Sequence, residues 1–324
     1  KILYVWFDAP IGYLSATMEW AEAQGDPDAW KTWWQDPESR LVHFIGKDNI
    51  AFHAVVFPSM LLGQGDSWGG NGFVLPWAIP ANEFYNLQGR KFSTSKGWHL
   101  DSTAFFETYS TDAARFHLLM TLPETADSEF TWEGFQATNN SLLADKLGNF
   151  ASRVLKFAAK SFEGKAPSSE GGLDSHPSLA EADAALEEIG VRIENFEFRA
   201  AAQALMKGCD ALNTFFDDQA PWKLTKGDAS DRALCGEVVE RCLAYLELLS
   251  RRMSPFCPDS AASLRTMLGE AAAGSGKDWG PESHGQPPAR AAAGAILGEA
   301  GVLFRKIEND AIQEEISRLE DAVS

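Results

Sequence analysis

The sequence predicts an α/β domain followed by an all-α domain, on three observations. Over residues 1–75, short apolar runs of strand length alternate with amphipathic stretches, which is the βαβα rhythm of a parallel sheet. From Thr131 onward the apolar residues take the spacing of long helices. Two stretches rich in Gly, Ser and Pro, 163–177 and 273–288, are expected to be loops or linkers within that helical part.

Bulk properties limit the class of protein. A chain of 324 residues with 45% hydrophobic content can form two ordinary domains with real cores. The net charge of −18 argues against indiscriminate nucleic-acid binding, so an RNA partner would need a local basic patch. Because the sequence has no apolar run of membrane-spanning length and no signal-peptide pattern, we expect a cytoplasmic protein with neither DNA nor a membrane as partner.

The four cysteines occupy helical-looking segments and form no Cys-x-x-Cys pair. A zinc knuckle or disulfide framework is therefore not expected in this chain. We interpret Cys209, Cys235, Cys242 and Cys257 as small core residues in a reducing compartment.

The first half divides into strands and helices that point to a ligand pocket. We expect strands over Ile2–Phe7, Leu41–Ile45 and Gly72–Ile79, and helices over Pro10–Ala23 and Asn49–Leu62. The first strand runs into a turn with Pro10 and Gly12, so Trp6, Ala9 and Tyr13 should lie at its carboxyl end, where open α/β sheets bind ligands.

A polar stretch with flanking glycines, Gln88–Gly97, is expected to be an exposed loop, with helices following over 102–110 and 111–120. In the second half we expect helices over 132–161, 180–195, 199–219, 220–226 and 231–254. A tail over 302–307 and a closing charged helix should pack back on the body.

The helix over 132–161 has two faces. Its core stripe consists of Leu143, Leu147, Phe150, Val154 and Phe157. A neighbouring line consists of Lys146, Asn149, Arg153, Lys156 and Lys160. That basic line is either a solvated face or, since the protein is otherwise acidic, an RNA-binding edge.

Five motifs in register carry a family resemblance. They are Tyr4-Val-Trp-Phe-Asp-Ala-Pro-Ile-Gly-Tyr13, Phe44-Ile-Gly-Lys-Asp-Asn-Ile-Ala-Phe-His53, Lys91-Phe-Ser-Thr-Ser95, Gly148-Asn-Phe-Ala-Ser-Arg153 and Gln219-Ala-Pro-Trp222. Together they resemble the methionyl-tRNA synthetases, a family of class I aminoacyl-tRNA synthetases. The resemblance implies the second half of a doubly wound Rossmann-like catalytic domain over 1–75, a small α/β connector over 76–130 similar to a stem-contact region, and an α-helical anticodon-binding domain over 131–324.

The implied reaction joins L-methionine to its tRNA through methionyl-adenylate, with ATP and Mg²⁺. By resemblance, the methionine side chain would lie among Trp6, Ala9, Pro10, Tyr13 and His53. Aromatic walls suit a flexible thioether. From the residues alone, Trp6 and Tyr13 could equally be core packing, and His53 a buried imidazole.

The ATP site has two implied parts. Gly46 and Asp48 end a strand, and the Asp48 carboxylate would accept hydrogen bonds from ribose hydroxyls. The alternative is that Asp48 is the N-cap of the following helix. The loop with Lys91, Ser93, Thr94, Ser95 and Lys96 resembles the signature Lys-Met-Ser-Lys-Ser. Since Thr94 stands where that signature has its second lysine, Lys91 and Lys96 would share the catalytic work with Mg²⁺. A solvated lysine loop is the alternative.

The remaining implied residues are those that read the anticodon of methionine tRNA, initiator, elongator or both. Asn149 and Arg153 match the family's reading pair, and Pro221 and Trp222 match its stacking platform. A guanidinium and an indole suit unpaired bases. Trp222 could instead be a buried core anchor.

The family's other ATP signature, His-Ile-Gly-His, and its zinc-knuckle insertion are absent from this sequence. We therefore expect a partial sequence that is inactive alone, with zinc possible only in a longer protein. One rival is a non-catalytic tRNA-binding or regulatory paralogue, favoured by Thr94 and opposed by the retained pocket residues. Another is a sibling class I synthetase, opposed by Ala9, Pro10 and the pair Arg153 and Trp222.

Overall fold

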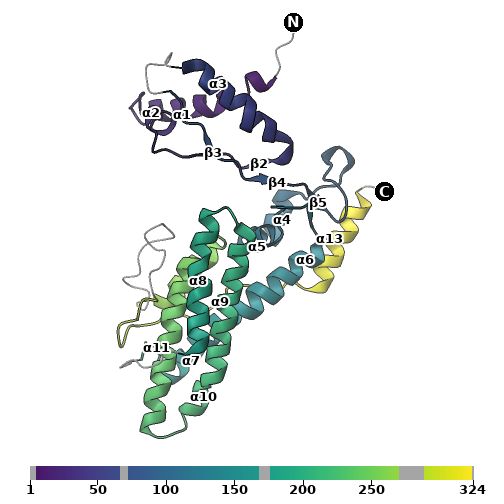
Figure 1. The fold of residues 1–324 in the computed structure, drawn as a ribbon. Helices are drawn as coiled ribbons and strands as arrows, with labels where there is room; N and C mark the ends of the chain where they lie inside the picture. Colours follow the sequence, from purple (N-terminus) through teal and green to yellow (C-terminus); the bar gives the residue numbers. More distant parts are fainter. Residues whose placement is uncertain (1–4, 66–71, 168–175, 270–287, 323–324) are drawn as a thin grey trace. The chain divides into compact units, whose positions relative to one another are not determined.

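A computed structural model describes residues 5–65, 72–167, 176–269 and 288–322. The chain forms two compact units (Figure 1). Unit 1 comprises Lys1–Tyr85 with Pro123–Ser128, and unit 2 comprises Asn86–Leu122 with Glu129–Ser324. The three-part division at residues 75 and 130 stays a prediction.

Parallel strand pairs organise unit 1, which confirms the predicted α/β class. Strand β1 (Leu41–Val42) pairs in parallel with β3 (Pro76–Ala78). Strand β2 (Ile45–Gly46) pairs in parallel with β4 (Ala81–Asn82). The predicted strand 41–45 is thus divided in two, and the predicted strand 72–79 is shortened to its last residues.

The helices of unit 1 follow the prediction closely. They are α1 (Ile11–Ala23), α2 (Trp30–Trp34), the 3₁₀ turn η2 (Lys47–Asn49), the π-helix η3 (Phe52–Val56) and α3 (Phe57–Gln64). The short helix α2 was not predicted, because five residues give too little periodicity to identify a helix.

The predicted first strand, Ile2–Phe7, is wrong where the structure describes it. Val5–Phe7 is the 3₁₀ helix η1, and residues 2–4 lie outside the described residues. The carbonyl of Val5 accepts hydrogen bonds from the backbone N–H of Asp8 at 3.0 Å and of Ala9 at 2.9 Å. These local bonds satisfy the backbone without a neighbouring strand, so an apolar run of this length need not extend.

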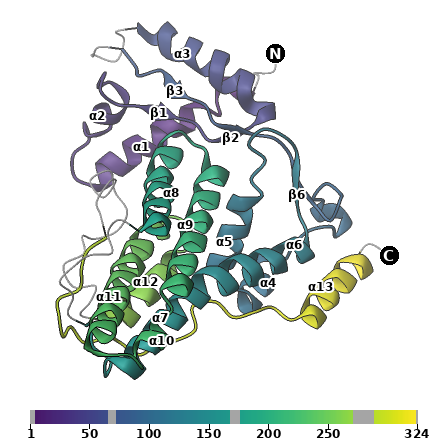
Figure 2. The same ribbon diagram turned by 60° about the horizontal axis from the view of Figure 1, so that its bottom comes forward.

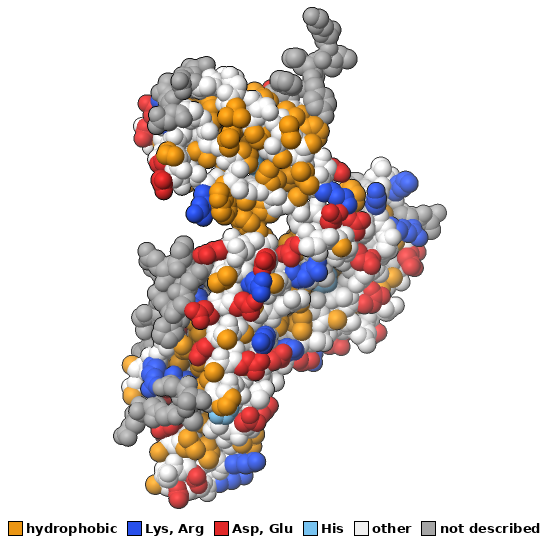
Figure 3. All heavy atoms as spheres, viewed as in Figure 1, with side chains coloured by type: hydrophobic (Ala, Val, Ile, Leu, Met, Phe, Trp, Pro, Cys, Tyr) orange, Lys and Arg blue, Asp and Glu red, His pale blue; other side chains and the backbone are white. Residues whose placement is uncertain are grey.

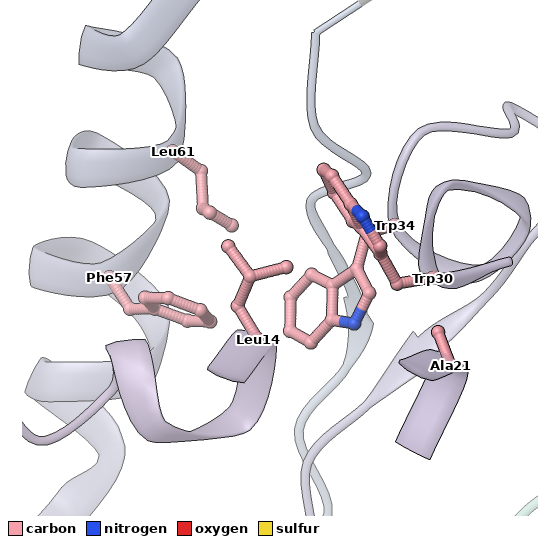
Figure 4. Close-up of a cluster of buried hydrophobic side chains, with 6 residues drawn as sticks. All are labelled: Leu14, Ala21, Trp30, Trp34, Phe57 and Leu61. Atoms are coloured by element: carbon pink, nitrogen blue, oxygen red, sulfur yellow. The ribbon is translucent and has the colours of Figure 1, made fainter. Parts of the chain in front are cut away.

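A small apolar core joins the helices of unit 1 (Figure 4). Its buried side chains are Leu14 and Ala21 from α1, Trp30 and Trp34 from α2, and Phe57 and Leu61 from α3. The Trp34 indole N–H donates to the Thr17 hydroxyl at 2.9 Å, which satisfies its polar atom. Packing of Leu14 with Phe57 fixes α1 against α3, and so fixes their neighbours Tyr13 and His53.

Unit 2 is mainly helical, as predicted. Its first helices are α4 (Ser102–Thr108) and α5 (Thr111–Met120). A continuous helical run follows, made of α6 (Trp132–Ala137), the π-helix η6 (Thr138–Gly148) and α7 (Asn149–Ser161), which confirms the predicted helix over 132–161. Strands β5 (Tyr85–Leu87) and β6 (Ser128–Phe130) pair with each other, and the division between the two units falls within them.

The later helices of unit 2 are α8 (Pro177–Glu194), α9 (Phe198–Gln219), α10 (Pro221–Leu224), α11 (Ala229–Arg252), α12 (Pro258–Leu268) and α13 (Asn309–Asp321). Helices α8 and α9 pack along each other as an antiparallel pair (Figures 1 and 2). The helix α12 was not predicted. The predicted loops 163–177 and 273–288 lie largely outside the described residues.

The expectation that the cysteines are core residues of unit 2 is confirmed. All four cysteines are free and buried, and burial raises the pKa of the Cys209 and Cys242 thiols. The tail before α13 lies against the long helix, since the Gln136 side chain donates to the Ile307 carbonyl at 2.9 Å.

The surfaces of the two units differ. On the face seen in Figure 3, basic and acidic side chains are interspersed over the helical unit, whereas hydrophobic side chains gather over unit 1. Exposed large apolar residues of unit 1 include Trp33, Phe44, Val55, Leu62 and Trp77. Within the described ranges, every helix is too short or too polar to cross a membrane.

Candidate functional site

An aromatic cluster forms around the first turn of α1. The Trp6 ring stacks on Phe52 with centroids 4.2 Å apart and planes 7° apart, and its edge meets His53 at 5.7 Å. The Tyr13 hydroxyl lies 3.0 Å from Nε2 of His53. The structure therefore brings together Trp6, Tyr13 and His53, residues that sequence reasoning had grouped from separate motifs.

Hydrogen bonding assigns the roles of the two nitrogens of His53. Its Nδ1 lies 2.9 Å from the Asn49 carbonyl oxygen, which can only accept, so Nδ1 carries the hydrogen. In the neutral ring Nε2 is then an acceptor, and the Tyr13 hydroxyl donates to it. The chain Tyr13 to His53 to Asn49 orients both side chains, with His53 only 2% exposed and Tyr13 45% exposed.

Ala9 and Pro10 lie at the start of α1, beside this cluster in sequence. Pro10 is buried at the N-cap position, and Ala9 is exposed. The Ala9 backbone N–H donates to the Val5 carbonyl. This local hydrogen bond holds the turn that carries Ala9 and Pro10.

Sequence reasoning missed two members of the cluster, Phe52 and His43. The His43 ring is 6% exposed and lies 5.0 Å from the His53 ring and 5.4 Å from the Tyr13 ring. Burial, and then the neighbouring His53, lowers the pKa of His43. His43 lies just before the Phe44 motif, where a single histidine gives no sequence signal, whereas Phe52 belongs to that motif itself.

The predicted ribose-binding residues lie on a turn at the end of β2. Gly46 ends the strand and precedes η2, and Asp48 is exposed in the first turn of η2. Asp48 lies inside η2, and the N-cap residue of the following helix η3 is Ala51, so Asp48 is not the helix N-cap of the alternative interpretation.

Lys47 holds this turn in place. Its ammonium forms ion pairs with Glu83 and, at 3.1 Å, with Asp127, and it lies 4.2 Å from the Phe84 ring centroid. The hydrogen bond to Glu83 is the main cause of the raised pKa of Lys47. The Asp127 carboxylate also accepts from the Phe84 backbone N–H at 3.0 Å, which lowers the pKa of Asp127.

The lysine loop of unit 2 is an ordered hairpin. The backbones of Ser93 and Trp98 exchange hydrogen bonds at 2.8 and 2.9 Å, and Thr94–Lys96 forms a 3₁₀ turn. Gly97 closes the turn with φ +72°, a conformation that favours glycine. The Trp98 indole N–H donates to the Leu87 carbonyl at 2.8 Å, which anchors the hairpin to β5.

The loop residues surround one open cavity of about 980 Å³. Its lining includes Lys91, Ser93, Ser95 and Lys96, all predicted for ATP, whereas Thr94 does not line it. Lys91 and Lys96 are exposed. Gly46 and Asp48 belong to unit 1, whereas the loop belongs to unit 2.

The far end of the helical unit carries a second aromatic cluster. The Arg153 guanidinium lies 5.0 Å from the Phe216 ring centroid and 5.7 Å from that of Trp222. Phe216 and Trp222 meet edge to face at 5.8 Å. Trp222 is 39% exposed, so it is not a buried core anchor. Phe216, which sequence reasoning missed, supports both residues from α9.

Pro221 is buried at the first position of α10, after Ala220 with φ +42°. This left-handed residue turns the chain sharply out of α9 and sets Trp222 beside Arg153.

The basic line of the long helix is partly neutralised by α9. Arg153 forms an ion pair with Asp217, and Lys146 forms one with Asp210 at 2.6 Å. Asn149, Lys156 and Lys160 are all exposed. The line therefore includes cations paired with α9 as well as exposed ones, and RNA binding at this edge stays a prediction.

No group of three His, Cys, Asp or Glu side chains within the described ranges is arranged to hold a metal ion.

Two family models match successive parts of the chain. Residues 1–155 match the class I tRNA synthetases of the methionyl type, and residues 168–322 match the anticodon-binding domain of methionyl-tRNA ligase.

Curated relatives agree with the family models. Methionine–tRNA ligase of Salinibacter ruber is 41% identical over 99% of this chain and 46% of its own length. That of Thermomicrobium roseum is 37% identical over 98% of this chain and 57% of its own length. The chain thus spans about half the length of the curated relatives it matches.

Solved structures give the same result. Free methionyl-tRNA synthetase of Mycobacterium tuberculosis has a TM-score of 0.76 at 25% identity, covering 95% of this chain and 56% of that one. The same protein in complex with methionyl-adenylate has a TM-score of 0.75 at 26% identity, covering 94% of this chain and 56% of that one. The chain belongs to the methionyl family of class I tRNA synthetases.

Proposed function

We propose that this chain is the part of a methionine–tRNA ligase that binds the methionine side chain, closes on ATP and reads the tRNA anticodon. The observation that carries the proposal is the hydrogen-bonded chain from Tyr13 through His53 to Asn49, walled by Trp6. The resemblance groups these residues as a methionine pocket, and the geometry supports that grouping. The adenylate complex of the Mycobacterium tuberculosis relative supports the same substrate.

In the proposed reaction the methionine carboxylate attacks the α-phosphorus of ATP, and pyrophosphate leaves. Trp6, Tyr13 and His53 hold the thioether, with Ala9 and Pro10 forming the turn beside it. Gly46 and Asp48 lie on the turn that the ion pairs of Lys47 hold in place. The Asp48 carboxylate accepts hydrogen bonds from ribose hydroxyls. Lys91 and Lys96 stabilise the charge that develops on the phosphates, and Ser93, Thr94 and Ser95 shape the loop. When bound, Mg²⁺ neutralises phosphate charge.

In the second step a ribose hydroxyl at the 3′ end of methionine tRNA, of the initiator or elongator kind, attacks the acyl carbon of methionyl-adenylate, and AMP leaves. Trp222 stacks on an unpaired anticodon base, and Arg153 and Asn149 contact its edges, with Pro221 fixing the position of the indole. The net charge of −18 confines RNA binding to this local basic edge. The four free cysteines suit a reducing cytoplasm.

The test is amino-acid-dependent ATP–pyrophosphate exchange by the longer protein that contains this chain. Methionine should support exchange, and leucine and isoleucine should not. Binding of methionine tRNA without any exchange would favour the second candidate, a non-catalytic tRNA-binding paralogue, for which Thr94 is the supporting observation.

A further inference from the structure

The segment from Phe304 to Ala322 runs beside the long helix over 132–161, from the level of Gly148 to the lysine loop. It lies entirely within unit 2. Phe304 is 7% exposed, and its ring lies 3.5 Å from the point where a side chain at Gly148 would begin. Gly148 directly precedes Asn149 of the predicted anticodon pair. Figure 2 shows the extended stretch that leads from the helical bundle into α13. We name residues 304–308 the strap.

Three side-chain amides of the long helix hold the strap by its backbone. Asn139 donates to the Arg305 carbonyl at 2.8 Å. Asn140 both donates to the Ile307 carbonyl and accepts from the Ile307 N–H, each at 2.8 Å. Gln136 donates to Ile307 at 2.9 Å and to the Asn309 side chain at 2.8 Å. Asn139 and Asn140 lie in the π-helical stretch η6. The wider turn of a π-helix changes which side chains share a face compared with an α-helix.

The helix α13 carries this constraint to the lysine loop. Its residues Ile312 and Leu319 are buried, and Leu319 lies with Phe105 and Trp132 around a cavity of about 200 Å³. Tyr109 donates to Glu315 at 3.5 Å. At the end of the helix, a Cβ at Gly97 would lie 2.8 Å from the Ala322 carbonyl oxygen. Ala322 also lines the cavity that contains Lys91 and Lys96.

We propose that α13, held by the strap, positions the lysine loop for catalysis and so joins the anticodon-bearing helix to the ATP-binding loop. The close fit of Ala322 on Gly97 restricts the backbone at the one residue that closes the hairpin. A shift of the long helix at 136–140 would move the strap, and with it the support of Gly97. The role in catalysis rests on the proposed function, whereas the mechanical role does not.

Hydrogen exchange of the 324-residue chain tests the mechanical role. Asn140→Ala removes the two hydrogen bonds that the Asn140 side chain makes with Ile307 and leaves that of Gln136. Amides of the strap and of residues 91–98 should then exchange about tenfold faster, while those of α9 should not change. Ser141→Ala, at the exposed neighbouring position, is the control and should alter none of them. A strap that exchanges faster beside an unchanged loop would overturn the proposal.

A second variant decides the question if Asn140→Ala leaves the strap protected. Leu319→Ala loosens α13 against Phe105 and Trp132 without touching the strap. Faster exchange in both α13 and the loop supports the proposal, and faster exchange in α13 alone refutes it.

Kinetics in the longer protein then separate positioning from general damage. Asn140→Ala should lower kcat of ATP–pyrophosphate exchange by about tenfold with the methionine KM within about twofold, because the methionine pocket lies in unit 1. Equal kcat in the variant and the Ser141→Ala control would contradict a positioning role. If the unmodified longer protein shows no exchange at all, the proposed function fails, and the hydrogen-exchange result still decides the mechanical role.

Discussion

Tyr13 donates its hydroxyl hydrogen to Nε2 of His53 across 3.0 Å, and the opposite nitrogen of His53 is fixed by the Asn49 carbonyl. Two motifs 40 residues apart in the chain therefore form one rigid unit. In the proposed enzyme this unit forms a wall of the methionine pocket.

Tyr13→Phe should raise the methionine KM in ATP–pyrophosphate exchange by about tenfold, with the ATP KM unchanged. The substitution leaves Nε2 of the buried His53 without its donor, at a cost of about 1–3 kcal/mol. Trp33→Phe, another conservative aromatic change in unit 1 at an exposed position, is the control. An unchanged methionine KM in Tyr13→Phe would show that Tyr13 and His53 do not form part of the methionine pocket.

Lys91→Ala should lower the exchange rate about a hundredfold, because loss of one positioned charge-stabilising donor costs about 3 kcal/mol. Lys31→Ala, in an exposed ion pair with Asp28, provides the matched lysine control. Thr94→Lys should raise the rate if Lys91 and Lys96 leave part of the phosphate charge uncompensated. An unchanged rate of ATP–pyrophosphate exchange in Lys91→Ala would show that the loop is a solvated surface loop without a catalytic role.

Trp222→Ala should weaken tRNA charging while sparing adenylate formation. The indole is 39% exposed and contacts Phe216 and Arg153, so its loss removes about 1–3 kcal/mol of base stacking without opening the core. Charging and exchange are measured on the same preparation, with Trp33→Phe as control. Parallel loss of both activities would show that Trp222 is structural.

Sequence patterns predicted the helices well because their signal is local. Leu143, Leu147, Phe150 and Val154 of the predicted stripe are buried as their spacing required, and Phe157 is half-buried. The helix over 111–120 has the predicted bounds. The strand at Val5–Phe7 was wrong because strand formation depends on a partner, which a local apolar run cannot supply.

Candidate site residues were grouped by motif, and partners outside the motifs were missed. Trp6, Tyr13 and His53 were found together, whereas His43 was not, since a single histidine beside a motif carries no pattern. The acids that pair with the basic line, Asp210 and Asp217, lie 64 residues away from their partners. Spacing within one helix cannot reveal a charge on another.

Asp217→Asn should increase affinity for an RNA hairpin that carries the methionine anticodon, and for hairpins with other anticodons as well. Asp217 pairs with Arg153 at the edge of the aromatic cluster, so it competes with RNA for the guanidinium and repels phosphates. The expected gain is about two- to fivefold at low salt, measured by fluorescence anisotropy, since exposed ion pairs contribute up to about 1 kcal/mol.

The neighbouring Asp218→Asn removes the same charge from an exposed position and serves as the control. An equal gain in both variants would mean that net charge alone is responsible, and no gain in either would contradict RNA binding at this edge.

The stability of unit 2 should fall as the pH drops from about 6.5 toward 4, because His117 is buried and neutral. Burial lowers the pKa of His117 to about 4. Its Nδ1 lies 2.9 Å from the Thr138 hydroxyl, which itself donates to the Gly134 carbonyl, so Nδ1–H is the donor to Thr138. Below the ordinary histidine pKa, the unfolded chain binds a proton that the folded chain excludes, and this difference amounts to about 3 kcal/mol at pH 4.

His117→Phe removes the titrating ring while keeping an aromatic between Phe130 and Phe135. Its free energy of unfolding, from urea titrations followed by tryptophan fluorescence, should therefore depend less on pH between 7.5 and 4.5 than that of the unaltered chain. Carboxylates titrate in both proteins, so the difference between the two curves isolates the histidine. His99→Phe, at an exposed position, should leave the pH dependence unaltered. Parallel curves for His117→Phe and the unaltered chain would show that His117 contributes nothing to acid sensitivity.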